Sequence, residues 1–184
     1  AMVKAAYSSG KPAIGVGAGN GPVYIHHSAD MEKALSCILR SKTFDYGTVC
    51  ASEQSIIVEA PMESTVKEKA SQMGFYFMDK EQAGCLAKIL FRPNGALNPE
   101  IVGRSAQELA QKAGFSVPQG VKVLVAREQE AGPTRPYSME KLCPVLAFFV
   151  MDSEDAVLNK AIEVLIHEGS GHTFAMHAED TAVI

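Results

Sequence analysis

The most informative absences in this 184-residue chain concern paired cysteines, basic charge and long apolar runs. None of the four cysteines forms a C-x-x-C pair, and their scatter favours free thiols in a reducing, cytoplasmic setting over a disulfide framework. Lysine and arginine number 17 against 21 acidic residues, and no basic stripe with interleaved aromatics is present, so we expect no nucleic-acid partner. No run is long and apolar enough to cross a membrane, and none resembles a signal peptide.

The five histidines also lack the spacing of a common metal site. No predicted helix carries H-x-x-x-H with a partner carboxylate, and glycines break the helix between His167 and His172. We therefore expect no bound metal. His26, His27, His167 and His177 are interpreted as surface or capping residues.

Strand-like and helix-like segments alternate along the chain, which predicts an α/β fold with a mostly parallel sheet flanked by helices. The apolar content of 47% is ordinary for a globular protein, and one domain is the simplest reading of the length. The pattern predicts strands at 13–16, 22–25, 55–59, 121–125, 145–151 and 172–176, with helices beginning near Ser28, Pro61, Asp79, Ser105 and Asp152.

Cys50 is the first candidate for chemistry. It lies in a turn of small residues directly before the apolar run 55–58, at the mouth of a predicted strand, where a substrate could reach its thiol. A thiolate in such a place is a strong nucleophile for a carbonyl carbon. The alternative reading is a small buried thiol, which is the commonest fate of a free cysteine.

Residues 43–54, with the sequence TFDYGTVCASEQ, resemble the nucleophile segment of CoA-acylating aldehyde dehydrogenases. The closest likeness is to the aldehyde dehydrogenase part of bifunctional aldehyde–alcohol dehydrogenases, and single-activity relatives are similar. The likeness runs from Met2 to about the C-terminus. It implies an excised catalytic domain at 13–184, preceded at 1–12 by the end of a nucleotide-binding domain.

The resemblance implies a two-step covalent reaction on Cys50. The thiolate would add to an aldehyde, the thiohemiacetal would be oxidised by NAD or NADP to a thioester, and coenzyme A would take the acyl group. Aldehyde and CoA are thus the expected small-molecule partners, with no metal and no membrane. The family also implies a homo-oligomer, and filaments of the full-length protein.

Three further residues are candidates by the same resemblance. Glu140 matches a glutamate that hydrogen-bonds the nicotinamide ribose hydroxyls, and its alternative is a solvated loop glutamate. His172, within G-S-G-H-T, would shuttle a proton near Cys50, and its alternative is a strand-edge histidine tied to the backbone. Gly17 lies in the segment GVGAGN, which resembles the one that packs near the thiol and cofactor, but this segment lacks the last glycine of G-x-G-x-x-G.

Val16 predicts which acceptor receives the acyl group. In hydrolytic aldehyde dehydrogenases the similar segment carries a glutamate that activates water, and here Val16 occupies that place. Valine cannot abstract a proton, so the thioester would wait for CoA. Two other functions remain open: a glutamyl-phosphate reductase-like thiol enzyme that acts on an acyl phosphate, and a non-catalytic domain kept for assembly.

Overall fold

The computed structural model describes residues 2–15 and 17–183, and its centre is a six-stranded sheet in which every neighbouring pair of strands is parallel. This confirms the predicted α/β class. The strand order across the sheet is β3-β4-β5-β2-β1-β6. The strands are β1 (Pro22–Ile25), β2 (Ser55–Glu59), β3 (Phe75–Phe77), β4 (Val123–Arg127), β5 (Val145–Met151) and β6 (Ala175–His177).

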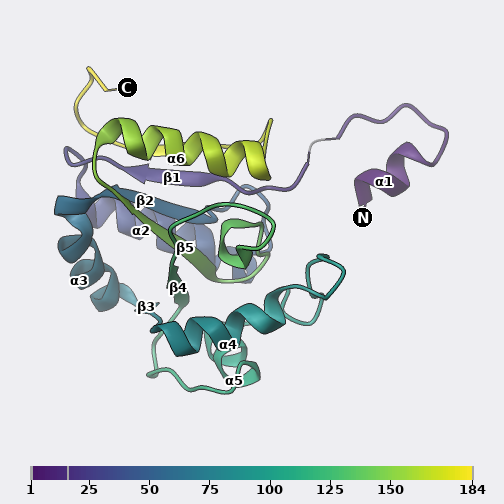
Figure 1. Cartoon of the computed structure of the whole chain (residues 1–184), viewed down its shortest axis with the longest axis horizontal. Coiled ribbons are helices and arrows are strands. Elements are labelled where there is room, and N and C mark those ends of the chain that lie inside the picture. Colours follow the sequence, from purple (N-terminus) through teal and green to yellow (C-terminus); the bar gives the residue numbers. More distant parts are fainter. Residues whose placement is uncertain (1, 16, 184) are drawn as a thin grey trace.

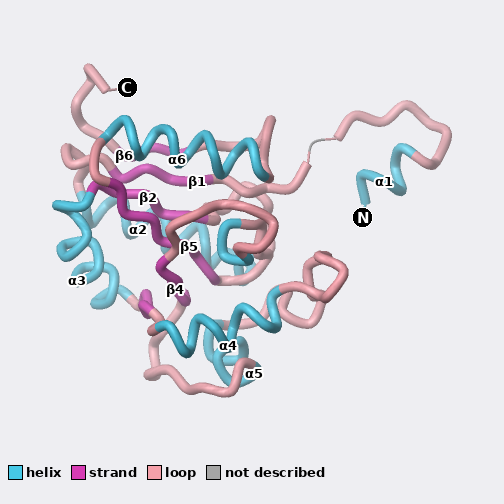
Figure 2. The backbone as a smooth tube through the Cα atoms, in the orientation of Figure 1, coloured by secondary structure: helices cyan, strands magenta, loops and turns pink. Residues whose placement is uncertain are grey.

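Helices cover both faces of this sheet (Figure 1). One helix, α6, lies over β1 and β2, whereas α2 and α3 lie on the opposite side, and α4 and α5 lie beside the β3–β4 end. The tube in Figure 2 shows the same layers, with the strands between the two sets of helices. The helices are α1 (Met2–Tyr7), α2 (Met31–Thr43), α3 (Glu63–Met73), α4 (Lys80–Leu90), α5 (Ala106–Lys112) and α6 (Glu154–His167).

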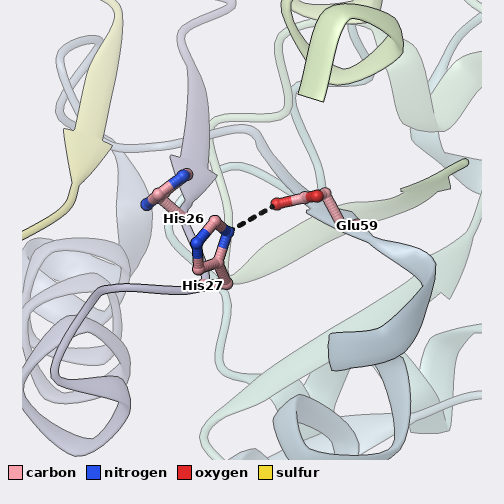
Figure 3. Close-up of side chains that lie close together, drawn as sticks. All are labelled: His26, His27 and Glu59. Carbon is pink, nitrogen blue, oxygen red and sulfur yellow. Dashed lines mark hydrogen bonds and ion pairs between the residues drawn. The ribbon is translucent and has the colours of Figure 1, made fainter. Parts of the chain in front are cut away.

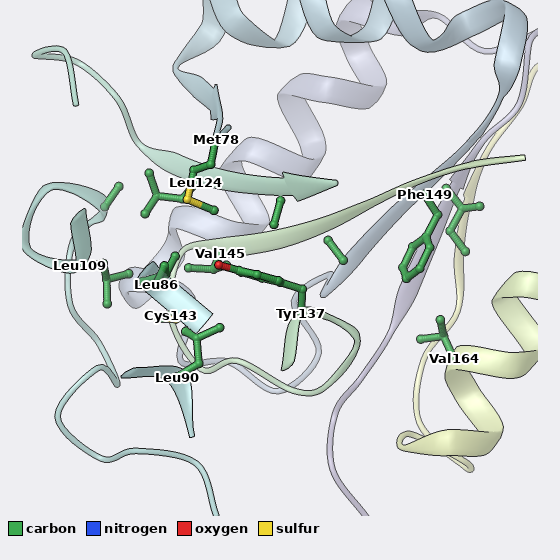
Figure 4. Packing of buried hydrophobic residues seen from close by; sticks show 14 of the residues in the cluster. Met78, Leu86, Leu90, Leu109, Leu124, Tyr137, Cys143, Val145, Phe149 and Val164 are labelled. Carbon is green, nitrogen blue, oxygen red and sulfur yellow. The ribbon is translucent and has the colours of Figure 1, made fainter. Parts of the chain in front are cut away.

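The central strands are buried on both faces because successive side chains point to opposite sides of the sheet. In β5, Phe149 packs on the side of α6, whereas Phe148 packs on the side of α2 and α3. The first of these two clusters continues between α4, α5 and the sheet, where Leu86 and Leu109 meet Leu124 (Figure 4). An uninterrupted apolar run such as β5 is therefore what a parallel strand in this position requires.

Short polar side chains begin four of the helices. Asp79 and Ser105 form capping boxes with the residues three positions later, close to where the sequence predicted that helices begin. Two predicted caps were wrong by one or two residues: Asp30, not Ser28, caps α2, and Ser153, not Asp152, caps α6. Ser28 instead contacts the ring of His26.

Other differences concern short strands. The predicted strand at 13–16 is wrong, since residues 13–15 are irregular, and Val16 lies outside the described residues. The strand expected at 172–176 is β6 and begins at Ala175, while the strand expected from Val121 is β4 and begins at Val123. The three-residue strand β3 was not predicted, because Phe75–Phe77 is too short to show alternation.

The first helix, α1, and the segment that follows it lie apart from the sheet (Figure 1). Within this segment the Tyr7 hydroxyl contacts the backbone of Gly15. The division at residue 12 between two domains stays a prediction. In the part of the chain that the structure describes, no helix is long and apolar enough to span a bilayer.

The topology brings three loops to one edge of the sheet. Residues 17–21 lead into β1, residues 47–54 lead into β2, and residues 139–144 lead into β5. Because β1, β2 and β5 are parallel neighbours, their amino ends lie side by side. Three candidate residues, Gly17, Cys50 and Glu140, are on these loops.

Candidate active site

Cys50 lies in an exposed loop whose backbone is unusually constrained. Asp45 and Tyr46, in the turn that follows α2, have positive φ angles of 47° and 51°, which non-glycine residues rarely adopt. Gly47 follows with φ 73°, and a Cβ there would lie 2.8 Å from the carbonyl oxygen of Cys143. The loop therefore rests on the β5 entry loop, with the thiol exposed as its sequence predicted.

Gly19 joins the two principal candidates. Its amide donates a hydrogen bond to Glu140 Oε1 at 2.8 Å. The glycine also lies so close to the backbone of Cys50 that no space remains for a side chain. A Cβ on Gly19 would lie 2.8 Å from the same carboxylate oxygen and closer still to the Cys50 carbonyl oxygen. Cys50 and Glu140, which are 90 positions apart in the sequence, thus meet at one glycine.

The other two candidates are placed differently. Gly17 is exposed, and a Cβ on it would meet nothing within 4 Å, so the close backbone approach occurs at Gly19 instead. The imidazole of His172 contacts its own loop, where Nδ1 accepts a hydrogen bond from the Thr173 amide at 3.0 Å. Thr173 in turn packs against Gly21, at the start of β1. The roles of Gly17 and His172 stay predictions.

Two fully buried lysines lie behind the thiol loop, and sequence reasoning missed both. Lys42 Nζ donates to Ser52 Oγ at 3.5 Å, and Lys141 Nζ donates to the carbonyl oxygens of Tyr137 and Met139 at 2.7 and 2.6 Å. Burial lowers the pKa of Lys42 to about 8. Burial, together with the nearby Lys42 charge, lowers the pKa of Lys141 to about 7.

Lys141 also ties the two loops together through its backbone. Its amide donates to Gln54 Oε1 at 3.0 Å, while the Gln54 amide donates to Gly21 O at 2.8 Å. The Glu140 amide donates to Glu168 Oε2 at 2.7 Å. All three loops at this edge are therefore cross-linked by hydrogen bonds, which fixes the position of Cys50 relative to Glu140.

Asn20 is a second residue that sequence reasoning missed. It is fully buried, and its Nδ2 donates to Ser138 O at 2.6 Å, which holds the segment before Glu140. Its Oδ1 is buried with no hydrogen-bond partner among the described residues. The signal available in the sequence was one polar side chain inside the glycine-rich segment 17–21.

A cavity of about 490 Å³ borders the thiol loop. Val49, Ala51 and Ser52 line it from the loop, and Cys37 and Arg40 line it from α2. The chain neighbours of Cys50 thus border a hollow, in keeping with a thiol that a small molecule can approach.

Comparison with known proteins finds relatives that are similar to nearly the whole chain. No protein-family model matches the chain. The aldehyde-alcohol dehydrogenase of Clostridium acetobutylicum is 42% identical over 179 residues, which are 97% of this chain. The acetylating aldehyde dehydrogenase of Geobacillus thermoglucosidasius superposes with a TM-score of 0.94 at 48% identity, over 99% of this chain. Over nearly its whole length the chain is similar to a part of each of these two dehydrogenases.

The match covers only part of each relative. The chain spans 21% of the Clostridium protein and 40% of the Geobacillus chain. The propionaldehyde dehydrogenase of Rhodopseudomonas palustris, which is also similar to this chain, has been solved with bound CoA and an acylated cysteine. That structure has a TM-score of 0.85 at 29% identity and covers 98% of this chain and 40% of its own.

One sequence interpretation needs correction. His26 was expected at the surface or as a cap, but its side chain lies at the end of β1 and is 1% exposed. The misreading arose because His26-His27 follows a four-residue strand, where sequence alone does not show which side chain turns inward.

Proposed function

We propose that this chain carries the nucleophile of a CoA-acylating aldehyde dehydrogenase, an oxidoreductase that reversibly converts an aldehyde, CoA and NAD(P)⁺ into acyl-CoA and NAD(P)H. The observation that carries the proposal is the exposed Cys50, held against Gly19 and Glu140 at one sheet edge in a chain similar to an acetylating aldehyde dehydrogenase. Because the chain spans a minor part of its relatives, the activity is proposed for the longer protein.

Cys50 would form and break one carbon–sulfur bond in each turnover. Its thiolate attacks the carbonyl carbon of the aldehyde, and the oxygen takes a proton to give a thiohemiacetal. A nicotinamide held at Glu140 would supply the hydride acceptor for the oxidation of that carbon, and Cys50 would then hold the acyl group as a thioester. The thiolate of CoA then attacks the thioester, and the Cys50 sulfur departs as a thiolate. His172 is the proposed carrier of the protons that move in these steps.

The residues present fit a nicotinamide cofactor at Glu140. A carboxylate offers two oxygens with about four acceptor positions, and the Gly19 amide uses one of them. Glu140 is half-buried, so it retains a solvent-facing portion for ribose hydroxyl groups. Its attachment to the backbone that contacts Cys50 would orient such a cofactor relative to the thiol.

Two finer parts of the proposal rest on the sequence. Retention of the thioester for CoA follows from valine at position 16, which lies outside the described residues. Homo-oligomers, filaments of a longer protein and a cytoplasmic location follow from the family resemblance and from the free thiols. Gly17 remains a candidate for the cofactor region, although its surroundings are open.

The test uses the full-length parent protein that contains this chain. Cys50→Ala should abolish CoA-dependent NAD(P)H formation from an aldehyde, whereas Cys37→Ala, which removes another exposed thiol, should retain it. Retained turnover in Cys50→Ala would contradict the proposal. Replacing CoA with inorganic phosphate separates the alternatives, since a reductase that acts on acyl phosphates would use phosphate and not CoA.

A further inference from the structure

Polar side chains gather at both ends of β1. At the carboxyl end, His26, His27 and Glu59 lie close together (Figure 3), and a contact of 3.3 Å between His27 Nδ1 and Glu59 Oε1 joins the ends of β1 and β2. The Ser28 amide donates to His26 Nδ1 at 3.2 Å. These contacts link residues at the strand ends to one another. At the amino end, the buried side chain of Asn20 reaches two more distant segments instead.

The Asn20 side chain is fully buried and connects the glycine-rich segment 17–21 to two other parts of the chain. Its Nδ2 donates to Ser138 O at 2.6 Å and, more weakly, to Val164 O at 3.5 Å. Ser138 precedes Glu140 by two residues, and Val164 lies in the last turn of α6. Both contacts are made by the amide nitrogen, so the side chain is needed here as a donor.

Asn20 also packs against the segment that carries His172. A Cβ on Gly169 would lie 3.0 Å from the Asn20 carbonyl oxygen and 3.3 Å from the Asn20 Cβ. Gly169 has a φ of 132°, and its carbonyl oxygen accepts a hydrogen bond from the His172 amide at 2.9 Å. The residue next to Gly19 therefore touches the segments that lead to Glu140 and His172.

The placement of Glu140 depends on two neighbouring attachments. The Gly19 amide donates to Glu140 Oε1 at 2.8 Å. The next side chain along, that of Asn20, donates to Ser138 O, two residues before that glutamate. Two hydrogen bonds at this spacing fix the direction between the segments as well as their separation. Without the second bond, the segment 138–140 can turn relative to Gly19, and the carboxylate turns with it.

We propose that Asn20 is a positioning residue, whose amide sets the direction of the Glu140 carboxylate toward the nicotinamide cofactor. The inference rests on the proposed function, in which Glu140 receives the ribose hydroxyl groups. Asn20 has no exposed surface, so it acts through Glu140 rather than by touching a substrate. A small displacement of an orienting group has a large effect on rate, because the reacting atoms must be close together and aligned.

Asn98 supplies a matched control. Its Nδ2 donates to Ile89 O at 2.9 Å, so it also holds a backbone carbonyl, but in the loop that follows α4. Asn20→Asp and Asn98→Asp each replace the amide with a carboxylate, which removes the donor and nearly keeps the shape. Both variants should be less stable in urea than the wild-type chain. Asn20→Ala and Asn98→Ala form a second pair, in case the buried carboxylate prevents folding.

Amide hydrogen exchange of the 184-residue chain, followed by NMR, tests the positioning without any catalysis. Loss of the Asn20 donor should speed exchange of the Gly19 amide at least tenfold, because its bond to Glu140 Oε1 opens more often. The Asn98 variants should change this rate less than twofold. Equal Gly19 exchange rates in the wild-type chain and the Asn20 variants would overturn the proposal.

Kinetics of the full-length parent protein test the consequence for the reaction. In the Asn20 variants, kcat/KM for NAD(P)⁺ should fall at least fivefold, whereas kcat/KM for CoA, which reports the later transfer from Cys50, should change less than twofold. A role in stability alone would lower both values by the same factor or leave both unchanged. Either of those results would overturn the proposal, as would loss of folding in both Asn20 variants while both Asn98 variants fold.

Failure of the proposed function gives a different result. A parent protein without CoA-dependent oxidation of aldehydes would contradict that function. The exchange rate of the Gly19 amide does not depend on turnover, so it would still decide whether Asn20 positions Glu140.

Discussion

The amide of Gly19 donates a hydrogen bond to the carboxylate of Glu140 across 121 positions of sequence. The same glycine lies against the backbone of Cys50, so one residue without a side chain sets the distance between the proposed nucleophile and the proposed cofactor-orienting group. The relative placement of the two loops therefore depends on a close backbone approach at Gly19, and four predictions follow from this site and the residues behind it.

Gly19→Ala should disrupt the site. Its Cβ would lie 2.8 Å from Glu140 Oε1 and closer to the Cys50 carbonyl, so one of the two loops must move. We expect a loss of about 1–3 kcal/mol in the free energy of unfolding of this chain, and a large loss of turnover in the parent protein. Gly17→Ala is the matched control, because its Cβ meets nothing within 4 Å. Equal effects of the two variants would contradict the packing described.

Glu140→Gln should impair use of the nicotinamide cofactor more than folding. An amide keeps the shape of the side chain but replaces one acceptor oxygen with a donor, so ribose hydroxyl groups would be bound less well. We expect kcat/KM for NAD(P)⁺ in the parent protein to fall tenfold or more, with a small change in urea unfolding. Glu100→Gln, at an exposed position, serves as control. An unchanged kcat/KM in Glu140→Gln would remove the residue from cofactor binding.

The four thiols should differ in reactivity toward iodoacetamide. Cys50 and Cys37 are exposed, whereas Cys143 is buried, and burial raises the pKa of its thiol to about 11. Mass spectrometry of the folded chain should find Cys50 and Cys37 alkylated and Cys143 protected. In urea all four should react. Modification of Cys143 as fast as that of Cys37 in the folded chain would show that the β5 entry loop opens readily.

Lys141 should make stability depend on pH. Its pKa is about 7 in the folded chain, against an ordinary value of 10.5, so between these values the unfolded chain binds a proton that the folded chain has lost. The free energy of unfolding should therefore rise with pH across this window, by up to about 1.4 kcal/mol per pH unit. The free energy of unfolding of the wild-type chain minus that of Lys141→Met should therefore increase from pH 7 to pH 10.

Urea unfolding at several pH values measures this difference. Lys122→Met, which alters an exposed lysine beside β4, provides the control, and its difference from wild type should stay constant with pH. Subtracting each variant from wild type removes the contributions of groups that lie far from the replaced lysine. A constant difference for Lys141→Met would mean that this lysine keeps its charge in the folded chain.

The long apolar strands and the capped helices of this fold are predictable from the sequence, because each carries its signal locally. β2 and β5 are apolar runs, and Asp79 and Ser105 stand three positions before a glutamine or glutamate that completes the cap. β3 has three residues and is stabilised by pairing with β4, a contact between segments almost 50 positions apart. No local pattern encodes such pairing.

The candidate site was predictable only in its exposed, motif-bearing residues. Cys50 and Glu140 lie in segments that resemble a known family, but the contact between them through Gly19 depends on tertiary packing. The buried lysines look like ordinary charged residues in the sequence, since Lys42 lies in the last turn of a helix and Lys141 lies in a loop.

The position of β5 in the sheet has a consequence for synthesis on the ribosome. β5 separates the pair β3-β4 from the trio β2-β1-β6, yet it is the fifth strand to be made. Until Val145–Met151 has left the exit tunnel, β4 and β2 each lack the strand that pairs with them. The nascent polypeptide therefore holds two partial sheets, each with an unpaired edge. Such a chain matures late and in one step, and a stop codon placed before this strand would leave a product for chaperones and proteases rather than a smaller stable domain.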